Sequence, residues 1–377
     1  MLSAQQPIPK SGPVPSQPWS RCGRSRTGWL LGLGLYALSA CGNSSTGSDP
    51  NGTVPTDPVE QMMTPAGACL PEVSCTGTPT GLSKSAWKHS ITSALVVASG
   101  SPRHRGIDLI VSADAKEQIL AGEISYGLVD KALEDEEIDV FVCRSGSWQL
   151  AGTVLTGSSN PVDGRFELHL QGSDRLPVGR RQVFASVRGD RSSLNFLAVV
   201  LPSGGQVAVS DIDGTLTSYE NEFPESLVTG AAVEAHDGAP EAFATLAERC
   251  YQPVYLTARG SVFTETTRTW LKERGFPVGP LRLAPNLITL PGETTVEYKA
   301  TTMQALQAAG LTVAVGNGNR ASDAQAYKQI GVATDHIFLK RPEYQSEIEP
   351  VIARGDAVGV DSYRALQPTF LTYPRAP

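Results

Sequence analysis

The sequence has little of the chemistry that builds a structural zinc site. Its 377 residues include only five histidines and six cysteines, and no two cysteines form a Cys-x-x-Cys pair. Because structural zinc is held by closely spaced cysteines and histidines, no such site is expected. The chain also lacks a basic excess, since its formal net charge is -7. This charge argues against general binding to a nucleic-acid backbone.

The apolar run near the N-terminus, residues 29–40, is too short to span a bilayer. Three arginines between positions 21 and 26 precede it, as basic residues precede the apolar part of a signal peptide. The run ends in Leu38-Ser39-Ala40-Cys41, which resembles the bacterial lipobox. This resemblance implies that residues 1–40 are a lipoprotein signal and that Cys41 is acylated. An ordinary signal peptide or an uncleaved short anchor is the alternative.

A lipobox implies a protein of the bacterial cell envelope, anchored to a membrane by lipid and facing the periplasm or the cell surface. Residues 41–81 are rich in Gly, Ser, Thr and Pro, which predicts a flexible linker. Cys69 and Cys75 lie close together there, and either a local disulfide or two free thiols fits their spacing. Cys143 lies in an apolar run and Cys250 ends a helical pattern, so both are expected to be buried free thiols.

Residues 82–204 contain seven short segments with alternating or β-branched character, separated by turn residues. Seven strands at this spacing predict an antiparallel β-sandwich of immunoglobulin-like type. The basic cluster Arg103-His104-Arg105 is expected to be solvated, with contact to lipid headgroups as a second possibility. The predicted strands are Ile107–Val111, Gln118–Tyr126, Ile138–Cys143, Trp148–Thr156, Arg165–Leu170, Gln182–Arg188 and Leu194–Leu201.

Residues 205–377 alternate between strand and helix patterns, which predicts an α/β domain with a doubly wound, mostly parallel sheet. Gln206–Ser210 reads as a buried strand that ends directly in Asp211-Ile212-Asp213-Gly214-Thr215. In an open α/β sheet, ligands bind beyond the carboxyl ends of the strands. Reactive side chains are therefore expected at this turn. The further predicted elements are Val254–Leu256, Phe263–Arg274, Thr301–Ala309, Thr312–Val315 and Ser322–Ile330.

An acidic turn or a calcium loop could also explain Asp211 and Asp213. An EF-hand loop that starts at Asp211 needs glycine at its sixth position, but Leu216 stands there. A calcium loop is therefore not expected. A structural acidic turn would not explain the polar residues that follow in order, namely Thr257 after the next strand, Lys299, and the pair Asn319 and Asp323 at the start of a helix.

The ordered set Asp-x-Asp-Gly-Thr, Leu-Thr-Ala-Arg, Lys and Gly-Asn-Arg-x-x-Asp resembles the four motifs of the haloacid dehalogenase superfamily. The motifs resemble the form found in lipin-type phosphatidate phosphatases and in the related C-terminal domain of phosphatidylinositol transfer proteins. The resemblance covers about residues 205–342. It implies a nucleophile at Asp211, a general acid at Asp213, phosphate contacts from Thr257 and Lys299, and Mg²⁺ held by Asp211, Asp213, Asn319 and Asp323.

The resemblance thus implies a magnesium-dependent phosphatase that hydrolyses phosphate monoesters through an aspartyl-phosphate. Phosphatidate or a related phospholipid is the expected substrate, because a tethered protein without a large inserted cap can reach a headgroup in a membrane. A soluble periplasmic phosphomonoester is an alternative substrate. A noncatalytic phosphatidate-binding module is a third possibility, against which the intact Asp211 and Asp213 count.

Overall fold

The computed structural model describes residues 69–159, 163–285 and 293–377. These residues belong to one compact unit. The predicted signal (1–40), the lipobox Cys41 and most of the predicted linker lie outside the described residues. In the described part of the chain, no helix combines the length and hydropathy needed to cross a membrane.

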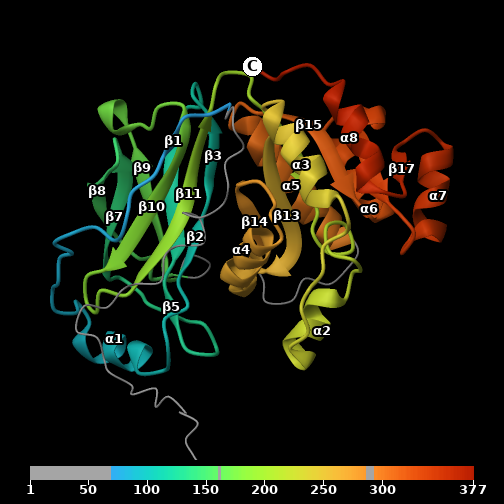
Figure 1. Ribbon diagram of the computed structural model, residues 1–377. Helices are drawn as coiled ribbons and strands as arrows, with labels where there is room; N and C mark the ends of the chain where they lie inside the picture. Colours follow the sequence, from blue (N-terminus) through green and yellow to red (C-terminus); the bar gives the residue numbers. More distant parts are fainter. Residues whose placement is uncertain (1–68, 160–162, 286–292) are drawn as a thin grey trace, which may run out of the picture. The chain divides into compact units, whose positions relative to one another are not determined.

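The first half of the described chain forms two β-sheets that face each other as a sandwich (Figure 1). The larger sheet has the order β3-β11-β10-β7-β8, with β1 added beside β10; the smaller has the order β2-β4-β9. Most neighbouring strands are antiparallel. The exceptions are β1, which pairs in parallel with β10, and β3, which pairs in parallel with β11. The strands are β1 (Glu72–Val73), β2 (Arg105–Ile107), β3 (Leu109–Ser112), β4 (Gln118–Glu123), β7 (Glu137–Arg144), β8 (Ser147–Leu155), β9 (Arg165–Leu170), β10 (Gly179–Val187) and β11 (Ser193–Leu201).

Alternating apolar residues fill the space between these sheets. Leu120 of β4, Val140 of β7, Val183 of β10 and Phe196 of β11 are fully buried in one cluster, because every second strand residue points to the same face. Three small elements lie at one end of the sandwich: helix α1 (Ser90–Val97), and a hairpin made of β5 (Ser125–Tyr126) and β6 (Lys131–Ala132).

The second half forms a six-stranded sheet in which all neighbours are parallel. Its order is β14-β13-β12-β15-β16-β17, which is 3-2-1-4-5-6 in chain order, as in doubly wound folds. The strands are β12 (Gln206–Ser210), β13 (Gln252–Gly260), β14 (Leu281–Ala284), β15 (Thr312–Gly318), β16 (Ile337–Lys340) and β17 (Val358–Val360).

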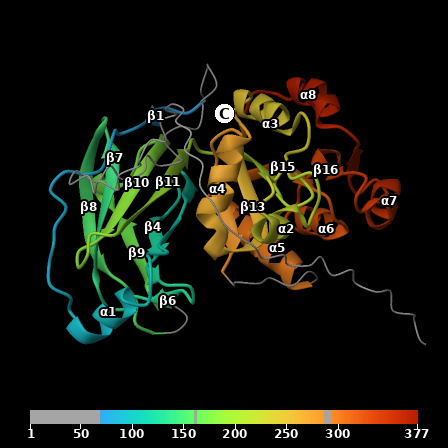
Figure 2. The ribbon, with the colours of Figure 1, turned by 60° about the horizontal axis from the view of Figure 1, so that its bottom comes forward.

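Helices cover both faces of this sheet. Figure 2 shows α3 and α8 above the sheet and α5 and α6 below it, in agreement with the contacts that α3 makes with α8 and α5 with α6. The α-helices are α2 (Glu222–Thr229), α3 (Ala239–Glu248), α4 (Thr264–Glu273), α5 (Glu293–Ala308), α6 (Ala321–Gln329), α7 (Gln345–Ala353) and α8 (Tyr363–Leu371). The predicted fold class, a β-sandwich followed by a mostly parallel α/β sheet, is confirmed.

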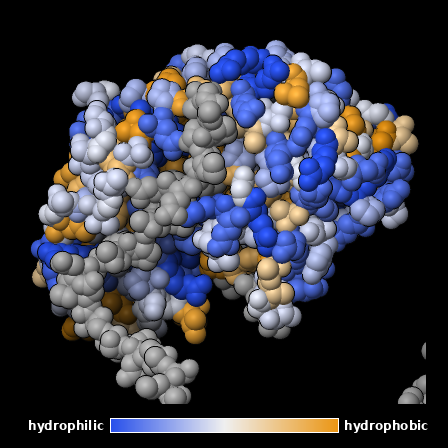
Figure 3. Space-filling model, viewed as in Figure 1, coloured by the Kyte–Doolittle hydropathy of each residue, from blue (hydrophilic) through white to orange (hydrophobic). Residues whose placement is uncertain are grey.

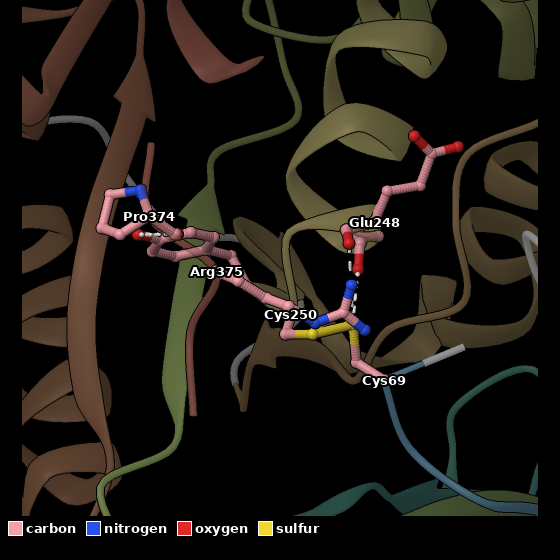
Figure 4. Close-up of a disulfide and its surroundings, with 7 residues drawn as sticks. Cys69, Glu248, Cys250, Pro374 and Arg375 are labelled. Atoms are coloured by element: carbon pink, nitrogen blue, oxygen red, sulfur yellow. Dashed lines mark hydrogen bonds between the residues drawn. A yellow bond between two sulfur atoms is a disulfide. The ribbon is translucent and has the colours of Figure 1, made fainter. Parts of the chain in front are cut away.

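The disulfides differ from the sequence-based expectation. Cys69 pairs with Cys250 across 181 residues, and Cys75 pairs with Cys143 across 68 residues. Cys143 and Cys250 are therefore not free thiols, and Cys69 and Cys75 do not bond to each other. Figure 4 shows the Cys69–Cys250 bond beneath the end of α3, with the Arg375 side chain beside it.

Two further predictions are corrected near the N-terminal side of the sandwich. Composition predicts a linker for residues 69–81, but this stretch contains β1 and two disulfide-bonded cysteines. The basic cluster is only partly solvated: Arg105 is buried in ion pairs with Glu123 and Asp130. His104 is also buried, and burial lowers its pKa to about 4.

A buried carboxylate joins the sandwich to the α/β sheet. Asp108, next to β3, accepts hydrogen bonds from Arg268 of α4 and from the backbone N–H groups of Leu197 and Leu281. Because the carboxylate is fully buried and multiply bonded, loss of one partner would leave an uncompensated charge. The network fixes the sandwich against the α/β sheet, and Ile110 of β3 with Leu197 and Val199 of β11 packs into the apolar core of the α/β sheet.

Candidate active site

The candidate site lies where the strand order of the parallel sheet reverses, between β12 and β15. Asp211 follows β12 directly, and Asn319 follows β15 directly. Thr257 lies in the neighbouring strand β13, and Lys299 reaches the same place from α5. Because the carboxyl ends of parallel strands lie at one edge, residues more than a hundred positions apart meet there.

The turn after β12 depends on a glycine at position 214. Gly214 has a φ of 63°, and a Cβ placed on it would lie 2.2 Å from the Asn319 side-chain nitrogen. Any other residue would therefore be strained and would collide with the loop after β15. The Gly214 N–H donates to the Thr217 hydroxyl at 2.8 Å, which closes the turn. The Asp-x-Asp-Gly-Thr sequence thus fixes the backbone that presents the two aspartates.

Lys299 lies between two buried carboxylates. Its ammonium donates to Asp211 Oδ1 at 2.7 Å and to Asp323 Oδ1 at 2.6 Å. Burial lowers the pKa of Lys299, but the two carboxylates raise it by more, so the net shift is upward and the lysine is charged. Burial raises the pKa of Asp211; Lys299 opposes this and Asp323 adds to it, and the net shift is upward.

The second oxygen of each carboxylate also has partners. Asp211 Oδ2 lies 3.1 Å from the Thr215 hydroxyl, which is 3.2 Å from Asn319 Oδ1. Asp323 Oδ2 accepts from the backbone N–H groups of Asn319 and Arg320 at 3.0 and 3.1 Å. Asp323 therefore caps the start of α6 and orients Lys299, and both of its oxygens are used in doing so.

Asp213 has a separate set of partners. Thr257 donates its hydroxyl to Asp213 Oδ2 at 2.9 Å. Arg259 donates to both oxygens of the same carboxylate, at 2.6 Å from Nη2 and at 2.9 and 3.0 Å from Nε. The Arg259 guanidinium is itself held by Thr267 and by the ring of Phe223, whose centroid is 3.8 Å away. Thr257, expected to contact phosphate, contacts Asp213 in this structure.

The structure thus brings all six predicted side chains into one place but divides them into two groups. Asp211, Lys299, Asn319 and Asp323 form one hydrogen-bonded network, and Asp213 with Thr257 forms the other. Two residues of the site, Arg259 and Glu220, were not among the predicted functional side chains. Arg259 could have been found from its position two residues after Thr257, because both side chains of an extended strand with this spacing lie on one face.

Glu220 carried no sequence signal, since it follows the motif in a loop. Its carboxylate accepts from the Asn319 amide at 3.0 Å. Burial raises the pKa of Glu220, and the Asn319 hydrogen bond opposes that shift. Glu343 lies close by and accepts from the Glu220 backbone N–H at 2.9 Å. Carboxylates therefore gather around Asn319, which makes the site attractive to a cation.

The available ligands suit magnesium better than a metal ion that is coordinated by protein side chains alone. Within residues 69–159, 163–285 and 293–377, no group of three His, Cys, Asp or Glu side chains is arranged to enclose a metal ion. Mg²⁺ commonly takes one or two carboxylates and completes its shell with water and phosphate oxygens. Asp211 and Asn319 offer hard oxygen ligands on either side of the Thr215 hydroxyl. Asp323 fits a supporting role instead, because Lys299 and the α6 N–H groups use its oxygens.

Comparisons with known proteins match both halves of the chain to one kind of protein. Residues 208–340 match the model of the LNS2 domain of PITM 1-3, and residues 102–200 match the model of the PITM 1-3 beta-sandwich domain. The chain resembles PITM 1-3 proteins over both halves. These matches include Asp211, Asp213, Thr257, Lys299 and Asn319.

Individual relatives have modest identity. The chain is 28% identical over 241 residues to protein retinal degeneration B of Drosophila melanogaster, covering 63% of this chain and 18% of the relative. It is 28% identical over 254 residues to human membrane-associated phosphatidylinositol transfer protein 3, covering 65% and 24%. Human phosphatidate phosphatase LPIN1 is 28% identical over 153 residues, covering 37% and 17%. The chain spans about a fifth of the length of these relatives.

Among solved structures, a putative HAD-like phosphatase from Mesorhizobium loti has a TM-score of 0.29 and 19% identity, covering 42% of this chain and 90% of that one. We draw nothing further from a likeness this low.

Replacing Arg259 with lysine should lower kcat of a reaction that depends on Asp213 by about ten- to a hundredfold and leave KM nearly unchanged. Lysine keeps the charge but cannot bridge both oxygens of Asp213, so the carboxylate loses its fixed position. Steady-state kinetics on the purified variant would measure both constants. The matched control is Arg364→Lys, because Arg364 also binds an aspartate, Asp237, but at the exposed surface. Equal activity of the Arg259 variant and this control would show that Arg259 does not position Asp213.

Proposed function

We propose that this protein is a magnesium-dependent phosphatase that hydrolyses phosphate monoesters through an aspartyl-phosphate. The observation that carries the proposal is the separation of two adjacent carboxylates into different surroundings. Asp211 is buried against Lys299, whereas Asp213 is held by Thr257 and Arg259. Two carboxylates with different partners suit two different roles, a nucleophile and an acid–base group.

In the first step, an Asp211 oxygen forms a bond to phosphorus while the bond from phosphorus to the leaving oxygen breaks. The leaving oxygen takes a proton from Asp213. In the second step, Asp213 takes a proton from water, the water oxygen bonds to phosphorus, and the bond to Asp211 breaks. Lys299 keeps Asp211 oriented and offsets negative charge. Bound magnesium, with Asp211 and Asn319 as ligands, would neutralise charge on the phosphoryl oxygens.

Arg259 holds both oxygens of Asp213 in this structure, an arrangement that suits the carboxylate that activates water in the second step. The first step requires Asp213 to carry a proton, so its carboxyl must turn from Arg259 toward the leaving oxygen. The Thr257 hydroxyl is then released for contact with a phosphate oxygen, the role expected from its motif.

A phospholipid is the substrate class that the relatives support best. These relatives include a phosphatidate phosphatase and a phosphatidylinositol transfer protein. Phosphatidate carries the phosphate monoester that the mechanism requires. Because other relatives are transfer proteins, a noncatalytic phosphatidate-binding module is the alternative. Asp211 and Asp213 are both present and have separate partners, which favours catalysis.

The substrate test compares phosphatidate in vesicles with a short soluble ester such as glycerol phosphate. We expect kcat/KM to be at least about tenfold higher for phosphatidate, because acyl chains supply binding energy that a small ester lacks. The fragment Thr53–Pro377 suits this test, since it lacks the predicted anchor but keeps Cys69 and Cys75. Chelation should stop turnover and added Mg²⁺ should restore it. A preference for the soluble ester would remove the lipid hypothesis, and full activity without divalent metal would contradict the magnesium site.

We also propose that the protein works outside the cytoplasm, attached to a membrane of the bacterial envelope through Cys41. The two disulfides support an oxidising compartment. In a bacterial host, Cys41→Ser should block acylation and release the protein from the membrane fraction, while Cys22→Ser serves as a control. Unchanged membrane attachment of the Cys41 variant, measured by fractionation and immunoblotting, would contradict the anchor.

A further inference from the structure

Four large aliphatic side chains are exposed together at one end of the sandwich. In the loop between β5 and β6, Leu128 is 92% and Val129 is 83% exposed. On α1, Ile91 is 75% and Leu95 is 61% exposed. We call these four residues the apolar tip. Isolated exposed aliphatic residues are ordinary, but a group on adjacent elements indicates a contact surface.

The two elements of the apolar tip are packed against each other. The Ser99 hydroxyl, just after α1, donates to the Tyr126 carbonyl at 3.3 Å, and the Gly127 N–H donates to the Ser101 carbonyl at 3.0 Å. Gly127 has a φ of 74°, and a Cβ there would lie 2.6 Å from the Ser99 carbonyl oxygen. The close approach therefore depends on this glycine, and it fixes the hairpin loop beside the helix. Figure 3 shows hydrophobic surface at the end of this hairpin, on the lower edge of the view.

A cavity lies between the β5–β6 loop of the apolar tip and the start of α4. This cavity has a volume of about 620 Å³ and is lined on the sandwich side by Arg103, Arg105 and Leu128. Its other wall is formed by Val262 and neighbouring residues at the start of α4. Val262 comes three residues after Arg259, which binds Asp213. The apolar tip therefore borders the segment that leads directly out of the catalytic strand β13.

We propose that the apolar tip inserts into the headgroup region of an anionic lipid bilayer and so brings the catalytic edge to its substrate. This inference rests on the proposed phospholipid substrate. The apolar tip is a projecting loop and helix, not a groove. Such a projection can insert among lipid headgroups. Lys131 follows the tip loop directly and can meet an anionic headgroup, whereas Lys88 and Arg103 at the margin lie beside Asp135 and Asp130.

The chain outside the described residues supports the same occupant. The stretch from the predicted anchor Cys41 to Cys69 contains 28 peptide links, and the covalent chain limits their separation to about 100 Å at most. The folded unit would thus stay within reach of the anchoring membrane. A second contact with that membrane would then gain from a high effective concentration.

The test is flotation of the fragment Thr53–Pro377 with phosphatidylcholine vesicles that contain a minority of phosphatidylglycerol. This fragment lacks residues 29–40 and Cys41, so only the folded unit and part of the linker can bind. Replacing Leu128 and Val129 with serine should lower the partition coefficient by about tenfold or more, because two nearly fully exposed aliphatic groups lose their burial. The matched control replaces Leu150 and Leu155 of β8, which are 54% and 47% exposed, with serine and should bind as the unchanged fragment does.

Three results would overturn the proposal: no vesicle binding by the unchanged fragment, equal binding by the tip variant, or an equal loss in the β8 control. A dimer in sedimentation velocity that only the tip variant abolishes, without effect on vesicle binding, would assign the surface to a second copy instead. Hydrolysis of a soluble ester should be the same in the tip variant and the unchanged fragment. Vesicle binding without any hydrolysis would support the docking surface while sinking the phosphatase assignment.

Discussion

Replacing Asp211 with asparagine should lower the rate of phosphate release by on the order of 10⁴-fold or more, because the change removes the attacking oxygen's charge. The fold should persist. Asparagine has nearly the same volume as aspartate. Burial raises the pKa of Asp211 because it disfavours the charged carboxylate, so a neutral side chain at this position removes a charge that is costly to bury. Lys299 keeps its bond to Asp323 at 2.6 Å.

The measurement is single-turnover phosphate release with enzyme in excess, together with a urea unfolding curve of the same preparation. Asp361→Asn is the matched control, because that carboxylate is 79% exposed and lies in the same α/β sheet domain. It should retain full activity. A folded Asp211 variant that releases phosphate at the rate of this control would rule out Asp211 as the nucleophile.

Replacing Lys299 with methionine should cost about 3–5 kcal/mol of unfolding free energy, because it leaves two buried carboxylates without their shared counter-charge. It should also reduce phosphate release by about a hundredfold or more, since Asp211 loses the group that orients it. Lys328→Met is the matched control. Its ammonium pairs with Asp356 but is 42% exposed, so removal should change the unfolding free energy by less than about 1 kcal/mol.

The stability deficit of the Lys299 variant should grow as the pH rises from about 5 to about 8. Burial raises the pKa of Asp211 above its unfolded value, so the folded state binds more protons than the unfolded state in this range. Stability from such a group is present below the unfolded pKa and is lost as the pH rises toward the folded pKa. Without Lys299 this loss is larger. A deficit that shrinks with rising pH in urea titrations would contradict the assigned charges.

Much of the fold could be predicted from sequence because the strands carry their own patterns. The seven segments predicted for the sandwich correspond to β3, β4 and β7 through β11, whereas β2 was not predicted, and the strand before Asp211 is β12. Helix α1 and strand β1 were missed for physical reasons. Helix α1 is short and lacks a side-chain cap, and β1 is a two-residue strand whose pairing with β10 is set by tertiary contacts.

The disulfides show the main limit of reasoning from spacing. Cys69 and Cys75 are close in sequence, yet each bonds to a cysteine in a different sheet region. Only the three-dimensional approach of Cα atoms decides such pairings, since several connectivities fit any set of four cysteines.

The residues of the candidate site were easier to predict than the contacts that these residues make with one another. Asp211 and Asn319 converge because they follow neighbouring parallel strands, and Lys299 reaches them from α5. The sequence did not indicate that Arg259 clamps Asp213, or that Lys299 bridges Asp211 and Asp323, because both contacts depend on side-chain directions between distant elements.

The covalent role of Asp211 can be tested most directly by trapping the intermediate. The fragment Thr53–Pro377 would be mixed with phosphate-labelled phosphatidate and Mg²⁺, quenched in acid within one turnover, and reduced with borohydride. An acyl phosphate on an aspartate is reduced to homoserine, which peptide mass spectrometry can locate. We predict label on the acid-quenched protein before reduction and homoserine at position 211 after it, with neither in the Asp211→Asn variant. Phosphate release without protein-bound label, or homoserine at another aspartate, would contradict the mechanism.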